Sequence, residues 1–475
     1  MKAIVLTFER LATRFLGCYG NDHVATPHWD RLASMATVFD HCLAESPHRE
    51  HLTDWWTGCH FNAFRSLESG PSLLEELRAM DVGTRLIYES PSMLDRNPRP
   101  GFDRRTPVSG IQGADVEDFE TPCAQLVAEG CRQLQAWQGD SRDALLWLHS
   151  QAIPVPWIPP QECAAPYFEN LTDWGEAEAT ETEQDPWHAD SSDAEADARG
   201  ASEEQDLLDF ERFVCSGGRL KTGNDWEATG LTASDWSLAR AAYAGYVSLV
   251  DSCLGRLLDA IEELDDRLLL LVTSAMGQSV RNIENWRQGP GGIREEDLHC
   301  PLLLHDSKSP HSTRRPDLVQ HVDLPPSVLD WFGRQQNRME GHSLLPAIRN
   351  ETGSTRTYVC FADTMQHGIR SQDFALVQPR TPSATPSATP SATPSATPDD
   401  NMRLFVKPDD YWEVTDLQAQ FPESAQQLEQ TLRAYESACA GPPPATLPPF
   451  VTHDDPQPGT SRAATDPLSA QDDPS

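Results

Sequence analysis

The sequence predicts an α/β fold, with a large and mainly parallel central β-sheet covered by helices on both faces and a smaller C-terminal subdomain built on an antiparallel sheet. Two observations support this prediction. Short apolar runs alternate along the chain with longer segments of helical periodicity, which is typical of sheets flanked by helices. The runs 144–149 and 268–274 are apolar almost throughout, as expected for strands buried on both faces.

The elements of the large sheet and its helices follow one another in a regular order. A helix that begins after Ser72 is favoured because serine is a good N-cap and the following residues repeat with helical spacing. The predicted elements are a first strand at 4–6, a helix over 72–80, a strand at 84–88, a buried strand at 144–149, an amphipathic helix from about 239 to 264, a central strand at 268–274 and a last strand at 301–305.

The C-terminal part begins near residue 351 and contains a low-complexity segment. Residues 381–398 repeat Thr-Pro-Ser-Ala four times, and a proline at every fourth position blocks both helix and strand pairing. Strand-like residues flank the repeat at 373–377 and 402–406, so we expect a hairpin with a lengthened loop, which costs little stability. A closing helix is predicted from 418 to about 440. We therefore expect one domain over 1–350, a second over 351–440 and a disordered tail over 441–475.

Charge is spread unevenly along the chain. The net charge is -36, which argues against nucleic acid and anionic membranes as partners because both would repel the protein. Residues 169–211 hold roughly 16 acids against one base, Arg199, with few apolar residues between them. This segment is predicted to be a solvated, poorly ordered insertion, and a docking segment for a basic protein partner is the functional alternative.

The length of the apolar runs and the pattern of the cysteines indicate a cellular location. No apolar run approaches the roughly 18 residues that cross a bilayer, and residues 1–7 are too short for a signal peptide. The 11 cysteines lack a CxxC pair or regular spacing, which indicates reduced structural thiols. We therefore expect a cytoplasmic protein.

A series of short motifs resembles the sulfatase family of the alkaline-phosphatase superfamily, in the family's order. The motifs lie at 4–7, 16–21, 26–33, 39–47, 57–58, 242–251, 255–258, 321–330, 341–346 and 411–417. The resemblance implies an alkaline-phosphatase/sulfatase-like three-layer sandwich. It also places an aromatic and acidic strand at 411–417.

The resemblance implies a chemistry that most of the matching positions cannot supply. Sulfatases hold a calcium ion with carboxylates and an amide, and they attack sulfate with a cysteine or serine modified to formylglycine. The family's first carboxylate pair falls on Glu9 and Arg10, and Ala12 and Arg14 follow where the family has arginine and aspartate. A divalent cation needs several oxygen ligands, most of them anionic.

The nucleophile and the second ligand group are replaced as well. The nucleophile position falls on His48 or Arg49, neither of which can become formylglycine. The family's Ser-Asp-His-Gly segment reads Ser-Ala-Met-Gly, so the ligand positions hold Ala275 and Met276. The family's catalytic lysine position holds Gln288, beside Arg287, and its His-x-Pro-Trp histidine falls on Pro154.

These replacements predict a catalytically inactive pseudo-sulfatase that keeps the fold, needs no cofactor and binds a small anion or sulfated ligand. The anion would be held by Arg10, Arg49 and Arg287, whose guanidinium groups are forked donors. The structural alternative is that the arginines pair with acids such as Glu9, Asp54 or Glu296. The functional alternative is a sulfuric or phosphoric ester hydrolase with a non-standard site, for which calcium would remain the expected cofactor.

Three other features are interpreted as structural. His48 and His51 could in principle bind a transition metal, but surface histidines are the simpler interpretation. The pair Trp55-Trp56 is expected in the core, and Asp251 is expected to cap or pair within the fold.

Overall fold

A computed structural model describes most of the chain. The described residues are 1–47, 54–60, 72–90, 101–154, 157–169, 233–264, 267–280, 293–308, 312–335, 338–349, 356–363, 365–380, 402–441 and 444–450. The acidic segment after residue 169, the Thr-Pro-Ser-Ala repeat and the tail after residue 450 lie outside them. The domain boundaries near 350 and 440 stay predictions.

The larger sheet has eight strands in the order β4-β3-β5-β1-β6-β7-β2-β8. All neighbours run parallel except at β7, which is antiparallel to both β6 and β2. The strands are β1 (Lys2–Arg10), β2 (Thr37–Leu43), β3 (Gly83–Glu89), β4 (Arg104–Val108), β5 (Ala144–Ser150), β6 (Leu268–Met276), β7 (His299–Asp306) and β8 (Thr313–Val319). The prediction of a mainly parallel central sheet is confirmed.

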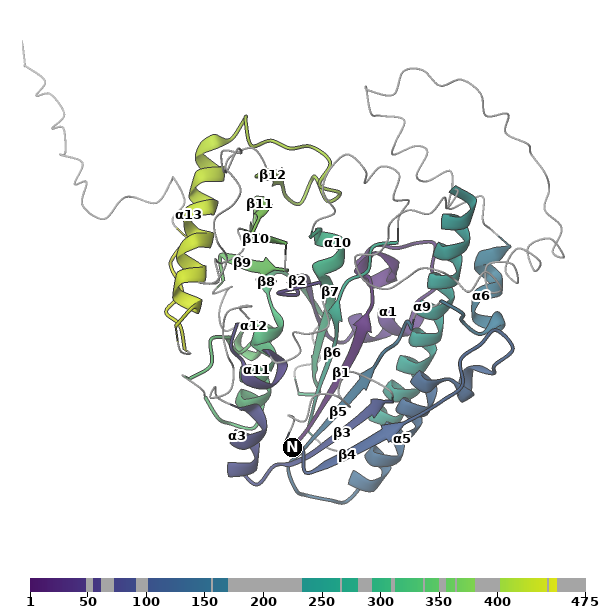
Figure 1. Ribbon diagram of the computed structural model, residues 1–475. Coiled ribbons are helices and arrows are strands. Elements are labelled where there is room, and N and C mark those ends of the chain that lie inside the picture. The colour runs from purple at the N-terminus through teal and green to yellow at the C-terminus, as the bar shows by residue number, and fades with distance from the viewer. Residues whose placement is uncertain are drawn as a thin grey trace, which may run out of the picture.

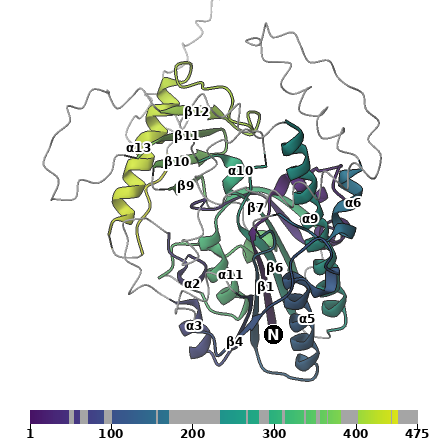
Figure 2. The same cartoon turned by 45° about the vertical axis from the view of Figure 1, so that its right-hand side comes forward.

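Helices cover both faces of this sheet (Figures 1 and 2). The helices are α1 (Pro27–Ala33), α2 (Asp54–Thr57), α3 (Leu73–Ala79), α5 (Pro122–Trp137), α6 (Gln161–Phe168), α9 (Ala233–Glu262), α10 (Glu295–Leu298), α11 (Leu324–Trp331), α12 (Leu345–Ile348) and α13 (Pro422–Cys439), with 3-10 turns η1 (Thr13–Phe15), η2 (Gly17–Tyr19), η5 (Asp118–Glu120) and η7 (His321–Asp323). Helices α5 and α9 lie on one face, and α3 and α11 lie on the other.

Alternation along β1 shows how the sequence builds the two cores. Ile4 and Leu6 pack with the α5–α9 layer, whereas Val5 packs with the α3–α11 layer, and all three are fully buried. The predicted cap of α3 is also present, because the Ser72 hydroxyl oxygen accepts a hydrogen bond from the Glu75 N–H at 3.5 Å.

A separate antiparallel sheet follows in the order β12-β11-β10-β9, packed against α13. Its strands are β9 (Tyr358–Ala362), β10 (Gln366–Ser371), β11 (Phe374–Pro379) and β12 (Arg403–Val406). Strands β11 and β12 pair as the predicted hairpin on either side of the repeat. The expected strand at 411–417 is wrong, because turns and irregular backbone occupy these residues and Glu413 has a φ of 56°.

Two further observations concern compartment and chemistry. Among the residues that the structure describes, no helix combines the length and the apolar character that a membrane crossing requires. The cysteines of these residues carry free thiols, and most are buried.

Candidate functional site

The carboxyl ends of the central strands bring the sequence-predicted positions together. Parallel pairing sets Arg10 of β1 opposite Met276 of β6, and Phe8 opposite Ser150 of β5. Ligands of open α/β sheets commonly bind at this end of the strands. We name this region the strand-end edge, and its members are Glu9, Arg10, Glu89, His149, Ala275 and Met276.

Arg10 is held at the strand-end edge by contacts on both its backbone and its side chain. Its Nη1 donates to Gln278 Oε1 at 3.0 Å, in the segment that follows β6. The buried hydroxyl of Tyr243 donates to the Arg10 carbonyl at 3.2 Å and accepts from the Ala12 N–H at 2.8 Å. Helix α9 therefore fixes the backbone at the end of β1, from which the guanidinium reaches Gln278.

Glu9 faces an imidazole across the strands. Its Oε1 lies 3.5 Å from His149 Nε2, and both side chains are fully buried. The Thr7 hydroxyl lies 3.1 Å from the Leu148 carbonyl and 3.0 Å from His149 Nδ1, within hydrogen-bond distance of both. This arrangement holds the imidazole ring and directs its Nε2 toward the Glu9 carboxyl.

These residues do not fit a calcium ion. Calcium takes six to eight oxygen ligands, and carboxylates supply most of the charge. Here Glu9 already faces His149, Arg10 introduces a cation, and the side chains of Ala275 and Met276 carry no oxygen. The donor set of the strand-end edge therefore suits an anion better than a divalent cation.

Helix α10 supplies acids next to this edge. Glu296 Oε1 accepts from Arg14 Nη1 at 2.9 Å, so an acid named as a partner for the three proposed arginines pairs with Arg14. Asp297 Oδ1 accepts from the Ser279 N–H at 3.2 Å. Burial and the negative charge of Glu296 raise the pKa of Asp297 to about 7, although Arg10 opposes the shift.

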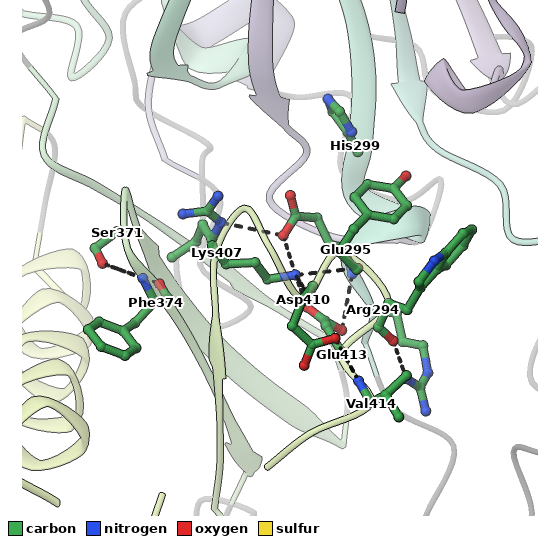
Figure 3. Close-up of polar contacts among 12 residues, drawn as sticks. Arg294, Glu295, His299, Ser371, Phe374, Lys407, Asp410, Glu413 and Val414 are labelled. Carbon is green, nitrogen blue, oxygen red and sulfur yellow. Dashed lines mark hydrogen bonds and ion pairs between the residues drawn. The ribbon is translucent and has the colours of Figure 1, made fainter. Parts of the chain in front are cut away.

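The third acid of α10, Glu295, points the other way, into a cluster that we name the sheet junction: Glu295, Arg370, Lys407 and Glu413. Figure 3 shows Lys407 reaching both carboxylates, with Nζ at 2.7 Å from Glu295 Oε2 and at 3.1 Å from Glu413 Oε1. Burial alone would raise the pKa of Glu295, but the charges of Lys407 and Arg370 outweigh it and lower the pKa to about 2.

Sequence reasoning missed the sheet junction and Glu89. Burial raises the pKa of Glu89 to about 7, and hydrogen bonds from Ser150 Oγ and the Gln151 N–H oppose that shift. A charged residue directly after the strand predicted at 84–88 was a usable signal for Glu89. Lys407 and Arg370 lie in short strands or turns far along the chain, and no spacing connects them with α10.

Several predicted positions lie outside the described residues. These are His48, Arg49, His51, Arg287 and Gln288. Of the three arginines proposed to hold an anion, the structure therefore places Arg10 alone. Pro154 is described, near the buried Trp157.

The features interpreted as structural behave as expected. Trp55 and Trp56 are 1% and 7% exposed, which confirms that they belong to the core. Asp251 Oδ1 accepts from the N–H groups of His28 and Trp29, both at 2.9 Å, and so caps the start of α1.

Two sequence comparisons match parts of the chain to the sulfatase family and to a protein of the alkaline phosphatase superfamily. Residues 117–334 match the sequence model of the sulfatase family. The chain is 28% identical over 129 residues to PehA, a multifunctional alkaline phosphatase superfamily protein of Trinickia caryophylli, and this alignment covers 26% of the chain and 25% of PehA.

Two solved structures resemble the fold over nearly its whole length. The phosphonate monoester hydrolase of Agrobacterium radiobacter is 18% identical with a TM-score of 0.63, covering 92% of this chain and 96% of the hydrolase. BT4656, solved with its substrate D-glucosamine-2-N,6-O-disulfate, is 18% identical with a TM-score of 0.61, covering 91% of this chain and 96% of that protein. At this identity the likeness shows a shared fold.

Proposed function

We propose that this chain, which matches the sulfatase family over residues 117–334, binds a sulfate- or phosphate-bearing anion at the strand-end edge. It would not hydrolyse this anion by the family's calcium and formylglycine route. The observation that carries this proposal is Arg10. Arg10 ends β1 opposite Met276 of β6, and its guanidinium donates to the Gln278 side chain in the segment that follows β6. A cation at that position favours an oxyanion and disfavours a metal.

The ligand class is supported by chemistry and by the relatives. A planar guanidinium matches the oxygens of sulfate and phosphate and forms charge-assisted hydrogen bonds with them. BT4656 has a sulfated sugar as its substrate, and the Agrobacterium enzyme acts on phosphonate monoesters. A sulfated sugar or a phosphorylated small molecule is therefore the proposed ligand, with Arg49 and Arg287 as the proposed additional donors.

Calorimetry at low salt tests the binding. We expect heat on titrating sulfate, phosphate or D-glucosamine-2-N,6-O-disulfate into the wild-type protein. Arg10→Met should weaken binding by about tenfold or more, since a hydrogen bond to a charged group contributes about 1.5–3 kcal/mol. Arg31→Gln is the matched control because Arg31 pairs with Asp259 and Glu262 on the surface of α1. Equal binding by both variants, or no heat with the wild type, would overturn the proposal.

Turnover assays with metal analysis test the missing catalysis. We expect no metal-dependent hydrolysis of aryl sulfate or phosphate esters and less than one calcium ion per chain after purification. Turnover that disappears in His48→Ala or Arg49→Ala, together with bound calcium, would establish the family's route in a modified form.

An ester hydrolase with a non-standard site is the second candidate, and a specific observation favours it. Glu9 and His149 form a buried carboxyl–imidazole pair, and Glu89 has a pKa near 7 at the same strand-end edge. Groups of this kind serve as general acids and bases when a substrate reaches them. Ester hydrolysis in the presence of a chelator, lost in His149→Phe but kept in His305→Phe, would favour this candidate over the first.

A basic protein partner for residues 169–211 and a cytoplasmic location are also proposed. Both rest on the composition of the chain.

A further inference from the structure

A second anion site is indicated at the sheet junction, apart from the strand-end edge. Arg370 lies in β10, the second strand of the smaller sheet from one edge, and is 1% exposed. Its neighbour Ile369 packs toward α13, so alternation turns Arg370 toward the larger sheet. A guanidinium is thus enclosed between the two sheets.

Arg370 shares its acidic neighbour Glu295 with Lys407, which lies closer to that carboxylate. Glu295 Oε2 lies 3.4 Å from Arg370 Nε but only 2.7 Å from Lys407 Nζ. Lys407 Nζ also lies 3.1 Å from Glu413 Oε1 and donates to the Asp410 carbonyl at 3.1 Å. The Glu295 carboxylate therefore interacts more strongly with Lys407 than with Arg370.

The two terminal nitrogens of the Arg370 guanidinium, Nη1 and Nη2, indicate where an anion would bind. Among the described residues, neither Nη1 nor Nη2 has a hydrogen-bond partner, although both are enclosed. A buried charged donor without a partner is expensive, and such groups in folded proteins usually meet an ion or a water molecule. Four N–H bonds of one guanidinium therefore point into a region that favours an acceptor.

The larger sheet presents a suitable second donor. His41 of β2 lies close enough to Arg370 that the guanidinium, after burial, is the main cause that lowers its pKa to about 4. Its Nδ1 is enclosed and has no hydrogen-bond partner among the described residues. His299 contributes no free nitrogen, because Nε2 donates to the Asp40 carbonyl at 2.8 Å and Nδ1 accepts from Thr13 at 3.2 Å.

We propose that Arg370, with His41 beside it, binds a small monovalent anion of the chloride type at the sheet junction. A halide has a single atom, so it can accept from both Nη groups without displacing the side chains that enclose them. Sulfate would bring four oxygens and a second charge next to Glu295 and Glu413. The anion would connect β10 of the smaller sheet with β2 of the larger one.

Thermal unfolding in matched salts tests the proposal. We expect the wild type to unfold at a temperature roughly 1–3 °C higher in sodium chloride than in sodium gluconate of equal ionic strength, because an anion that binds the folded state stabilises it. Arg370→Lys should remove this difference, whereas Arg314→Lys, on a half-exposed arginine that pairs with Asp40, should keep it. An equal difference in all three proteins would assign the effect to general salt and overturn the site.

Crystals of the wild-type protein grown in bromide keep the test independent of any variant that fails to fold. We expect an anomalous peak within hydrogen-bond distance of Arg370 Nη1 and Nη2. Side chains or water alone around these atoms would overturn the proposal. Sulfate binding at Arg10 is measured separately, so either anion site can fail without the other.

Discussion

At the sheet junction each buried carboxylate meets a cation, whereas at the strand-end edge the buried Glu89 accepts hydrogen bonds from neutral groups, Ser150 Oγ and the Gln151 N–H. Glu295 and Glu89 are both buried glutamates, yet the pKa of the first is lowered to about 2 and that of the second is raised to about 7. The difference lies in Lys407 and Arg370, which only Glu295 has nearby. A buried carboxylate that meets a cation stays charged and indicates a structural role, whereas a buried carboxylate with neutral partners indicates a place where a proton can bind.

Removing the cation of the matched region should have the largest effect. Lys407→Met leaves Glu295 and Glu413 buried without their shared partner, and we expect the free energy of unfolding to fall by about 3–5 kcal/mol. Urea denaturation measures this change. Lys308→Met, on an exposed lysine, serves as the control with a change below about 0.5 kcal/mol. Similar losses in both variants would show that the sheet junction is not a matched cluster.

The unmatched glutamate should make stability depend on pH. The pKa of Glu89 is raised from 4.5 to about 7, so the folded state holds its proton longer, and stability falls as pH rises through this window. We expect Glu89→Gln to stabilise the protein at pH 8 relative to its effect at pH 5 by about 2–3 kcal/mol. Denaturation at the two pH values measures it, with the exposed Glu75→Gln as the control. A pH-independent effect would contradict the unmatched environment.

Arg10, the last residue of β1, and Arg14, which follows the strand, should separate stability from binding. Arg14→Met removes one partner of the buried Glu296, and we expect a loss of about 1–2 kcal/mol in stability with little change in anion affinity. Arg10→Met should lose less than about 1 kcal/mol in stability but most of the affinity. Denaturation and calorimetry on both variants make the comparison, and an exchange of the two results would reverse the assigned roles.

The fold was largely predictable because long apolar runs and helical periodicity are local signals. The strands at 4–6, 84–88, 144–149 and 268–274 all lie in the larger sheet. The prediction of a strand at 411–417 was wrong for a physical reason. Its backbone is fixed by contacts that the sequence does not reveal, including the hydrogen bonds from the Val414 and Thr415 N–H groups to the Asp410 carboxylate.

The strand-end edge was predictable as far as position, because motifs around β1 and β6 set the register that brings Arg10 and Met276 together. The side-chain partners of these residues were harder to predict. Glu296 was predicted as an acid that arginines could pair with, but its pairing with Arg14 was not predicted, nor was that of Glu9 with His149. Each joins residues more than a hundred positions apart, and no local pattern encodes such a contact.

Calorimetric titration of sulfate into the wild-type protein, in EDTA and again in calcium, tests the central account most directly. If the guanidinium of Arg10 has taken the place of the metal, sulfate should bind with the same affinity under both conditions. Binding that appears only with calcium would contradict this account and restore a metal-dependent site.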